Sequence, residues 1–77
     1  MINYSRLIRS DIDMIRECGA LTQMQSRIFD VMLAGRLTRS DAAEELGMSY
    51  SKFHAAEQIL GEKIERILEE KSAKNQI

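Results

Sequence analysis

The chain has 77 residues, 44% hydrophobic and 30% charged, with a formal net charge of −1 and an isoelectric point near 5.8. This length suits a single domain near the lower limit for a self-supporting core, and the charge balance argues against a strongly basic, autonomous nucleic-acid binder. The absence of proline and of alternating β-branched runs predicts an all-α fold, a small bundle of about four or five helices.

Two helices are expected in the first half of the chain. Residues 3–18 place apolar side chains at helical spacing, as do residues 21–34. Thr22 followed by Gln25 forms a capping-box pattern at the start of the second helix. The glycines expected to end these helices are Gly19 and Gly35.

The stretch TRSDAAEELGMSYSKFHAAEQIL, residues 38–60, predicts two helices joined by a tight turn. Gly47 can adopt the positive φ that ends a helix, and Ser49 is a natural N-cap for the next one. Small, apolar and glycine residues stand at the spacing typical of a helix-turn-helix: Ala43, Leu46, Gly47, Met48, Phe53 and Ala56. In that motif the second helix enters the DNA major groove. The alternative is an ordinary helical hairpin.

Beyond residue 60 the helical pattern continues to about Lys71. Gly61 predicts either a kink or a separate helical extension over residues 61–72, because glycine in a helix interior costs about 1 kcal/mol. An apolar stripe follows, formed by Ile64, Ile67 and Leu68. We expect this stripe to be a homodimer or docking seam. Its alternative role is to cover the N-terminal helix of the same chain.

If residues 50–60 form a recognition helix, four outward side chains would meet base edges. Gln58 suits the two-pronged contact with adenine, and Ser51 and His54 can donate to guanine acceptors. Ala55 could meet a thymine methyl group. The alternative for His54 and Gln58 is simple solvation.

Five further residues are candidates for the phosphate backbone. Tyr50 and Lys52 suit phosphate oxygens, and Ser49 can present its backbone N–H. Arg36 and Arg39, beside the preceding helix start, are candidate backbone clamps. For Tyr50 the alternative is packing of its ring against a neighbouring helix.

The residues that catalysis or metal binding requires are not brought together by any motif. His54 is the sole histidine, and with Glu57 one turn away it gives only two ligands, too few for a metal site. We therefore expect no enzyme activity, no metal and no cofactor. A lone cysteine, Cys18, cannot form an intramolecular disulfide, and neither a signal peptide nor a membrane span is apparent. These features predict a cytoplasmic protein.

Residues 21–60 resemble the tetrahelical helix-turn-helix domains of LuxR-type regulators and the promoter −35-binding region of bacterial sigma factors. The resemblance rests on the Leu-Thr opening at 21–22, IFDVMLAG at 28–35 and DAAEELGMS at 41–49. The chain departs from these families at Phe53 and His54, where they carry a β-branched and a basic residue. GMSYSKFHAAEQI also resembles a helix of ModE-type regulators, but no strands for their β-wing follow it.

The resemblance implies a bacterial or phage transcription regulator that reads double-stranded DNA. We expect one helix-turn-helix domain over residues 1–77, acting as a homodimer or beside a partner such as RNA polymerase or another regulator. Because the charge is slightly acidic, the alternative is a protein-interaction module that keeps the helix-turn-helix shape without binding DNA alone.

Overall fold

The computed structural model describes residues 3–75, with side chains described to residue 70. A short 3-10 helix, η1, precedes four α-helices. Their bounds are η1 Tyr4–Arg6, α1 Arg9–Cys18, α2 Gln23–Ala34, α3 Arg39–Glu45 and α4 Tyr50–Asn75. The described residues contain no strand, so the all-α prediction is confirmed. None of their helices is long and apolar enough to cross a membrane.

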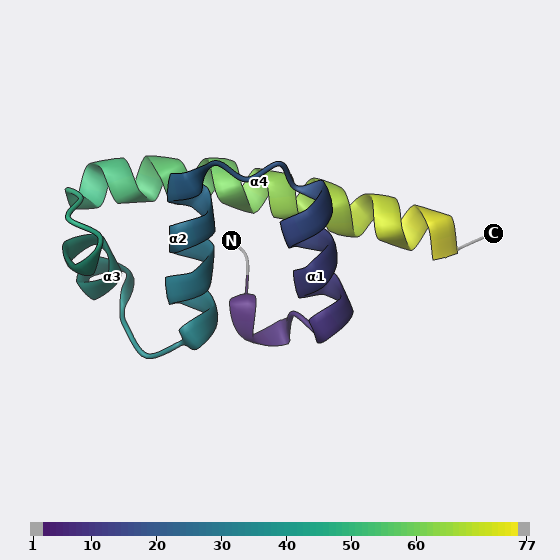
Figure 1. Ribbon diagram of the computed structural model, residues 1–77, viewed down its shortest axis with the longest axis horizontal. Helices are drawn as coiled ribbons and strands as arrows, with labels where there is room; N and C mark the ends of the chain where they lie inside the picture. Colours follow the sequence, from purple (N-terminus) through teal and green to yellow (C-terminus); the bar gives the residue numbers. More distant parts are fainter. Residues whose placement is uncertain (1–2, 76–77) are drawn as a thin grey trace.

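The longest helix, α4, forms the axis of the molecule, and the three shorter α-helices pack along one side of it (Figure 1). At 1.5 Å per residue, its 26 residues span about 39 Å, nearly the full 43 Å length of the molecule. Both α1 and α2 lie across α4, whereas α3 lies beside its N-terminal end (Figure 1). Each of the three shorter α-helices therefore buries part of its surface against α4.

Helix boundaries in the middle of the chain follow local capping. The Thr22 side chain accepts a hydrogen bond from the Gln25 backbone N–H, and the Gln25 side chain accepts one from the Thr22 N–H, which confirms the predicted capping box. Gly35 ends α2 with φ +66°, a left-handed conformation that favours glycine. Thr38 caps α3 by accepting from the Asp41 N–H at 3.1 Å.

The N-terminal segment does not form the single helix expected over residues 3–18. The Asn3 side chain accepts from the Ser5 N–H and starts the 3-10 turn. Leu7 and Ile8 are then extended, and α1 begins only at Arg9. The Asp11 carboxylate accepts from the Ile8 N–H at 3.2 Å. Short polar side chains thus provide local hydrogen bonds that compete with a continuous helix.

Gly19 is the C-cap of α1, as expected, but its φ of −77° is ordinary. Glycine is needed here because the backbone packs closely against its neighbours. A Cβ at residue 19 would clash with the Ile15 carbonyl oxygen and lie 3.3 Å from Ile67 Cδ1. The positive φ, +48°, falls instead on Ala20. The Lys63 ammonium donates to the Ala20 carbonyl at 3.3 Å and to Gln25 Oε1 at 2.8 Å. This tether holds the α1–α2 turn against α4.

Gly61 does not interrupt α4, which continues without a break from Tyr50 to Asn75. The expectation of a separate extension over residues 61–72 is therefore wrong. Leu60 and Ile64, on either side of the glycine, are fully buried. Their burial offsets the intrinsic cost of one helical glycine, because burying a side chain of this size is worth about 1.5–3 kcal/mol.

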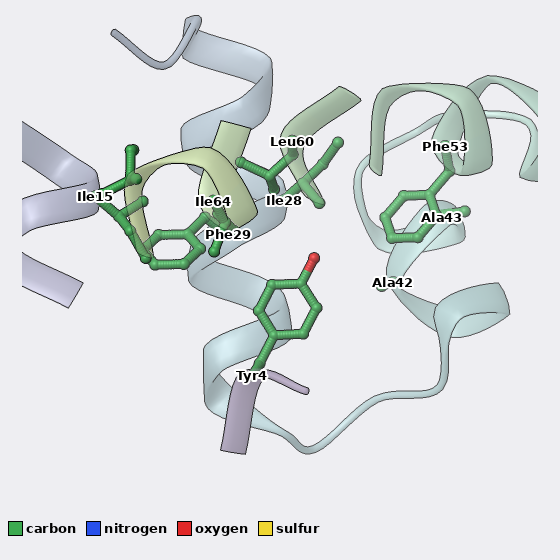
Figure 2. Close-up of a cluster of buried hydrophobic side chains, with 10 residues drawn as sticks. Tyr4, Ile15, Ile28, Phe29, Ala42, Ala43, Phe53, Leu60 and Ile64 are labelled. Atoms are coloured by element: carbon green, nitrogen blue, oxygen red, sulfur yellow. The ribbon is translucent and has the colours of Figure 1, made fainter. Parts of the chain in front are cut away.

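A single apolar core follows the inner side of α4. Its largest fully buried side chains are Phe29, Phe53, Ile15, Ile28, Leu60 and Ile64. Around Phe29 and Ile64 the side chains of η1, α1, α2 and α4 converge, and Phe53 packs with Ala42 and Ala43 of α3 (Figure 2). Small alanines allow α3 to approach α4 closely.

The apolar stripe of α4 belongs to this core. Ile64 is fully buried, Ile67 is 8% exposed, and Leu68 is half-buried against the cluster. In this half of α4 the helix packs against α1 (Figure 1). The stripe therefore covers the N-terminal helix of its own chain and leaves no apolar seam at Ile64 and Ile67 for a second copy.

Candidate nucleic-acid interface

A tight turn joins α3 to α4. Gly47 has φ +69°, the left-handed value expected from the sequence. The Met48 N–H donates to the Ala43 carbonyl at 2.9 Å, and the Gly47 N–H donates to the Glu44 carbonyl at 3.0 Å. These bonds satisfy the end of α3 and let the chain reverse within a few residues.

The start of α4 is capped from the same turn. Ser49 Oγ accepts from the Lys52 N–H at 3.3 Å, as expected for an N-cap. Phe53 is fully buried one turn later and anchors α4 on α3. The turn and the anchor together leave the opposite side of the first turns of α4 open to solvent.

Most of the candidate DNA-contacting side chains lie in solvent. Exposed residues among them are Arg36, Ser49, Tyr50, Ser51, Lys52, Ala55 and Gln58, while Arg39 and His54 are half-buried. Among these nine residues, Arg39 is the one that forms an ion pair with another part of the protein, through Glu57. The other eight lie in the turn, on α4 or in the loop before α3. The Tyr50 ring stacks on His54 of its own helix, with centroids 6.2 Å apart and planes at 10°.

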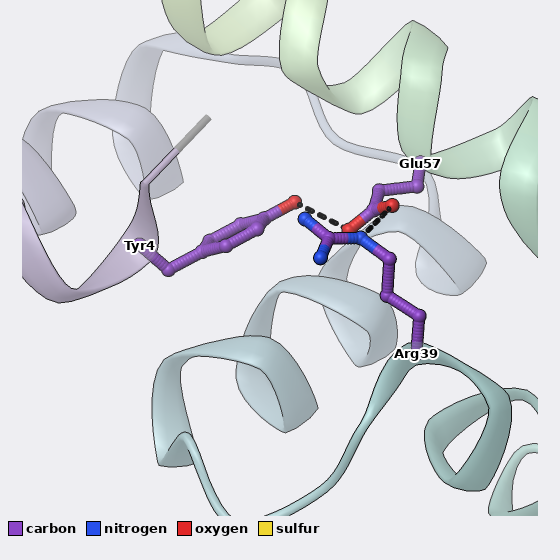
Figure 3. Close-up of polar contacts among 3 residues, drawn as sticks. All are labelled: Tyr4, Arg39 and Glu57. Carbon is purple, nitrogen blue, oxygen red and sulfur yellow. Dashed lines mark hydrogen bonds and ion pairs between the residues drawn. The ribbon is translucent and has the colours of Figure 1, made fainter. Parts of the chain in front are cut away.

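Arg39 takes part in a buried polar network that the sequence did not reveal. Its Nε donates to Glu57 Oε1 at 2.8 Å, and the Tyr4 hydroxyl donates to Glu57 Oε2 at 3.4 Å (Figure 3). Glu57 is only 6% exposed. The guanidinium that was expected to clamp a phosphate is therefore paired with a carboxylate inside the protein.

Burial and the nearby carboxylate also act on Tyr4. Desolvation of its phenol, followed by the negative charge of Glu57, raises the pKa of Tyr4 well above its ordinary value. The hydroxyl therefore stays protonated and keeps donating to Glu57. The one sequence signal for this network was the position of Glu57, four residues after Phe53 and three before Leu60, on the apolar side of α4.

Beside this network lies an open cavity of about 290 Å³. It is lined by Tyr4, Arg39, His54, Glu57, Gln58, Gly61, Glu62 and Glu65. Glu57 is paired with Arg39, so the net negative charge of the lining comes from Glu62 and Glu65, and phosphate is repelled from that end of the cavity. Lys52 lies away from it, fourteen residues (two heptads) before Arg66 along α4, and offers a cation on the other flank.

One row of exposed residues along α4 divides into two parts. Its members recur at alternating spacings of four and three: Ser51, Ala55, Gln58, Glu62, Glu65 and Glu69. The first three side chains are uncharged and the last three are carboxylates. A polyanion could therefore approach only the first three turns of α4 without facing like charge.

Other binding chemistry is sparse in the part of the chain that the structure describes. Within it, no group of three or more histidine, cysteine, aspartate or glutamate side chains is placed to hold a metal ion. Cys18 is exposed and unpaired with any other cysteine. No family model, curated protein or solved structure matches this chain.

Proposed function

We propose that this protein is a sequence-specific DNA-binding transcription regulator of the helix-turn-helix class. Its α3 and α4 would form the motif, with the first three turns of α4 in the major groove. The observation that carries this proposal is the capped helix start after the Gly47 turn, which exposes an uncharged polar face at Ser51, Ala55 and Gln58.

The proposed base contacts follow from side-chain chemistry. The Gln58 amide can bind adenine through a donor and an acceptor, and the Ser51 hydroxyl can donate to guanine N7 or O6. Ala55 lies between them on the same face and would contact a thymine methyl group. His54 is half-buried and stacked on Tyr50, so its role would be at the edge of the interface.

The proposed phosphate contacts come from Lys52, Tyr50 and the Ser49–Tyr50 backbone, with Arg36 on the loop before α3. With Arg39 paired to Glu57, few cations remain for the backbone. Each neutralised phosphate contributes about −0.9 to the slope of log affinity against log salt. One copy would therefore bind with modest affinity, and a second copy or a partner such as RNA polymerase would strengthen the complex.

Selection of binding sites from random duplexes, followed by a salt series on the selected duplex, tests the proposal. We expect a consensus of a few base pairs and a negative salt slope. Lys52→Ala should make the slope about one unit less steep. Arg66→Ala is the matched control, because it removes a charge from the same flank of α4 two heptads away. No enriched site for the intact protein would refute the proposal.

The acidic second half of the exposed α4 face favours one other function. Glu62, Glu65 and Glu69 lie in solvent, and Ile59 on the adjacent flank is 52% exposed. These residues suit a protein-interaction module that binds a basic partner protein. Under this alternative the salt slope for DNA would be absent, and changes at Glu65 and Glu69, not at Lys52, would abolish function.

A further inference from the structure

Three segments far apart in the sequence meet at the Glu57 carboxylate. Tyr4 comes from η1, Arg39 is the first residue of α3, and Glu57 lies at the end of the second turn of α4. One carboxylate oxygen accepts from Arg39 and the other from Tyr4 (Figure 3). Both oxygens are thus occupied by donors from different elements.

The rest of the α3–α4 contact has little directional character. α3 has only seven residues and buries Ala42 and Ala43 against Phe53. Apolar packing between such small side chains is non-directional. By contrast, a charge-assisted hydrogen bond from a planar guanidinium has a preferred geometry. The Arg39–Glu57 pair is therefore the contact best suited to setting the angle between α3 and α4.

Tyr4 extends this control to the N-terminal segment. Its ring is buried, at 7% exposure, with its centroid 6.3 Å from that of Phe29 in α2. The phenol is held by the core while its hydroxyl holds the second oxygen of Glu57. The position of the Glu57 carboxylate is consequently fixed relative to α2, through Tyr4, as well as to α3, through Arg39.

We propose that Tyr4, Arg39 and Glu57 are positioning residues that fix α4 on α3 in the orientation needed to read DNA. This inference rests on the proposed function, because the orientation matters only if α4 meets a duplex. Arg39 thereby acts through Glu57 and not by binding phosphate. η1 becomes part of the DNA-reading unit although it is the first element of the chain, far from α3 and α4 in the sequence.

The test separates orientation from stability. In Tyr4→Phe/Arg39→Met/Glu57→Leu, all three polar groups of the network are replaced by apolar side chains of similar size, a change that often leaves the stability of a protein unaltered or raises it. The control, Lys63→Met, removes another charged tether of α4, the one to Gln25 at the α2 start, without touching α3. Glu57→Gln provides a second, milder variant, in which an uncharged carboxamide of the same shape replaces the carboxylate.

The first readout needs no DNA. Spin labels at Ser40→Cys on α3 and Arg66→Cys on α4, both exposed positions, would be introduced in a Cys18→Ser background, and the distance distribution between them measured. We expect one narrow distribution for the parent protein and for Lys63→Met. It should broaden or shift in both network variants. An unchanged distribution in folded Tyr4→Phe/Arg39→Met/Glu57→Leu and Glu57→Gln would overturn the inference.

The second readout is the ratio of affinities for the selected and a scrambled duplex. We expect the ratio to fall by about tenfold in the network variants, with thermal stability of the triple variant near that of the parent. Full discrimination in a variant with altered label distances would also overturn the inference. If the parent protein does not discriminate, the proposed function fails, while the label distances still decide whether the network sets the α3–α4 angle.

Discussion

Glu57 is a carboxylate on the buried side of α4, and a buried charge is costly unless it is paired. Here Arg39 supplies the opposite charge and Tyr4 a second donor. Within the described residues, no buried side-chain nitrogen or oxygen lacks a hydrogen-bond partner. The network is therefore complete, and removing any one member leaves the others unsatisfied.

Arg39→Ala should destabilise the protein by about 2–3 kcal/mol, because it leaves Glu57 buried without its counter-charge. Arg36→Ala is the matched control: this arginine is exposed three residues earlier, and its loss should cost less than about 0.5 kcal/mol. Urea unfolding of the two variants measures the difference. Equal midpoints would show that the Arg39–Glu57 pair contributes nothing to stability.

Tyr4 should make the protein sensitive to alkali. Its pKa is raised in the folded state, chiefly by burial, so its contribution to stability is complete below the unfolded-state pKa near 10. That contribution decreases as the pH rises from there toward the folded-state pKa, because only the unfolded state then releases the proton. Between roughly pH 9 and 11.5, the unfolding midpoint of the wild-type protein should fall by more than the midpoint of Tyr4→Phe does. Parallel curves would contradict this.

At the scale of the elements, short-range capping chemistry explains most of what could be predicted. Thr22 and Ser49 cap helices as expected, Thr38 caps α3 in the same way, and Gly35 and Gly47 take positive φ. Each of these signals is contained within four or five residues, so the sequence alone suffices. The break at Leu7–Ile8 follows from local hydrogen bonds of Asn3 and Asp11, which the helical spacing of apolar residues does not show. The continuity of α4 through Gly61 depends on the burial of Leu60 and Ile64 against distant residues, which local patterns do not contain.

Gly47→Ala tests the turn itself. A Cβ at Gly47 would meet no atom within 4 Å, so the expected loss of about 1–2 kcal/mol comes from the left-handed backbone alone. Gly61→Ala in the middle of α4 serves as the comparison and should gain up to about 1 kcal/mol from helix propensity. Chemical denaturation of both variants measures these changes. A neutral Gly47→Ala would mean that the turn carries no conformational constraint.

At the scale of the whole molecule, one long helix serves as both core and surface. The inner side of α4 organises the bundle, and its outer side passes from uncharged to acidic residues. The candidate surface at Ser51, Ala55 and Gln58 could be predicted from helical periodicity, because the buried side was readable from Phe53 and Leu60. The pairing of Arg39 with a buried carboxylate could not be predicted from the sequence, because Glu57 is 18 residues away and Tyr4 is farther still.

Contact between the first turns of α4 and DNA is tested most directly by amide NMR of the isotope-labelled protein with its selected duplex. Spectra would be recorded with the selected duplex and with a scrambled one at the same salt concentration. We predict that the selected duplex shifts the backbone signals of residues 49–59, while those of α1 and of the acidic half of α4 stay in place. Shifts confined to α1 or to residues 62–70, or no shifts at all, would contradict the account.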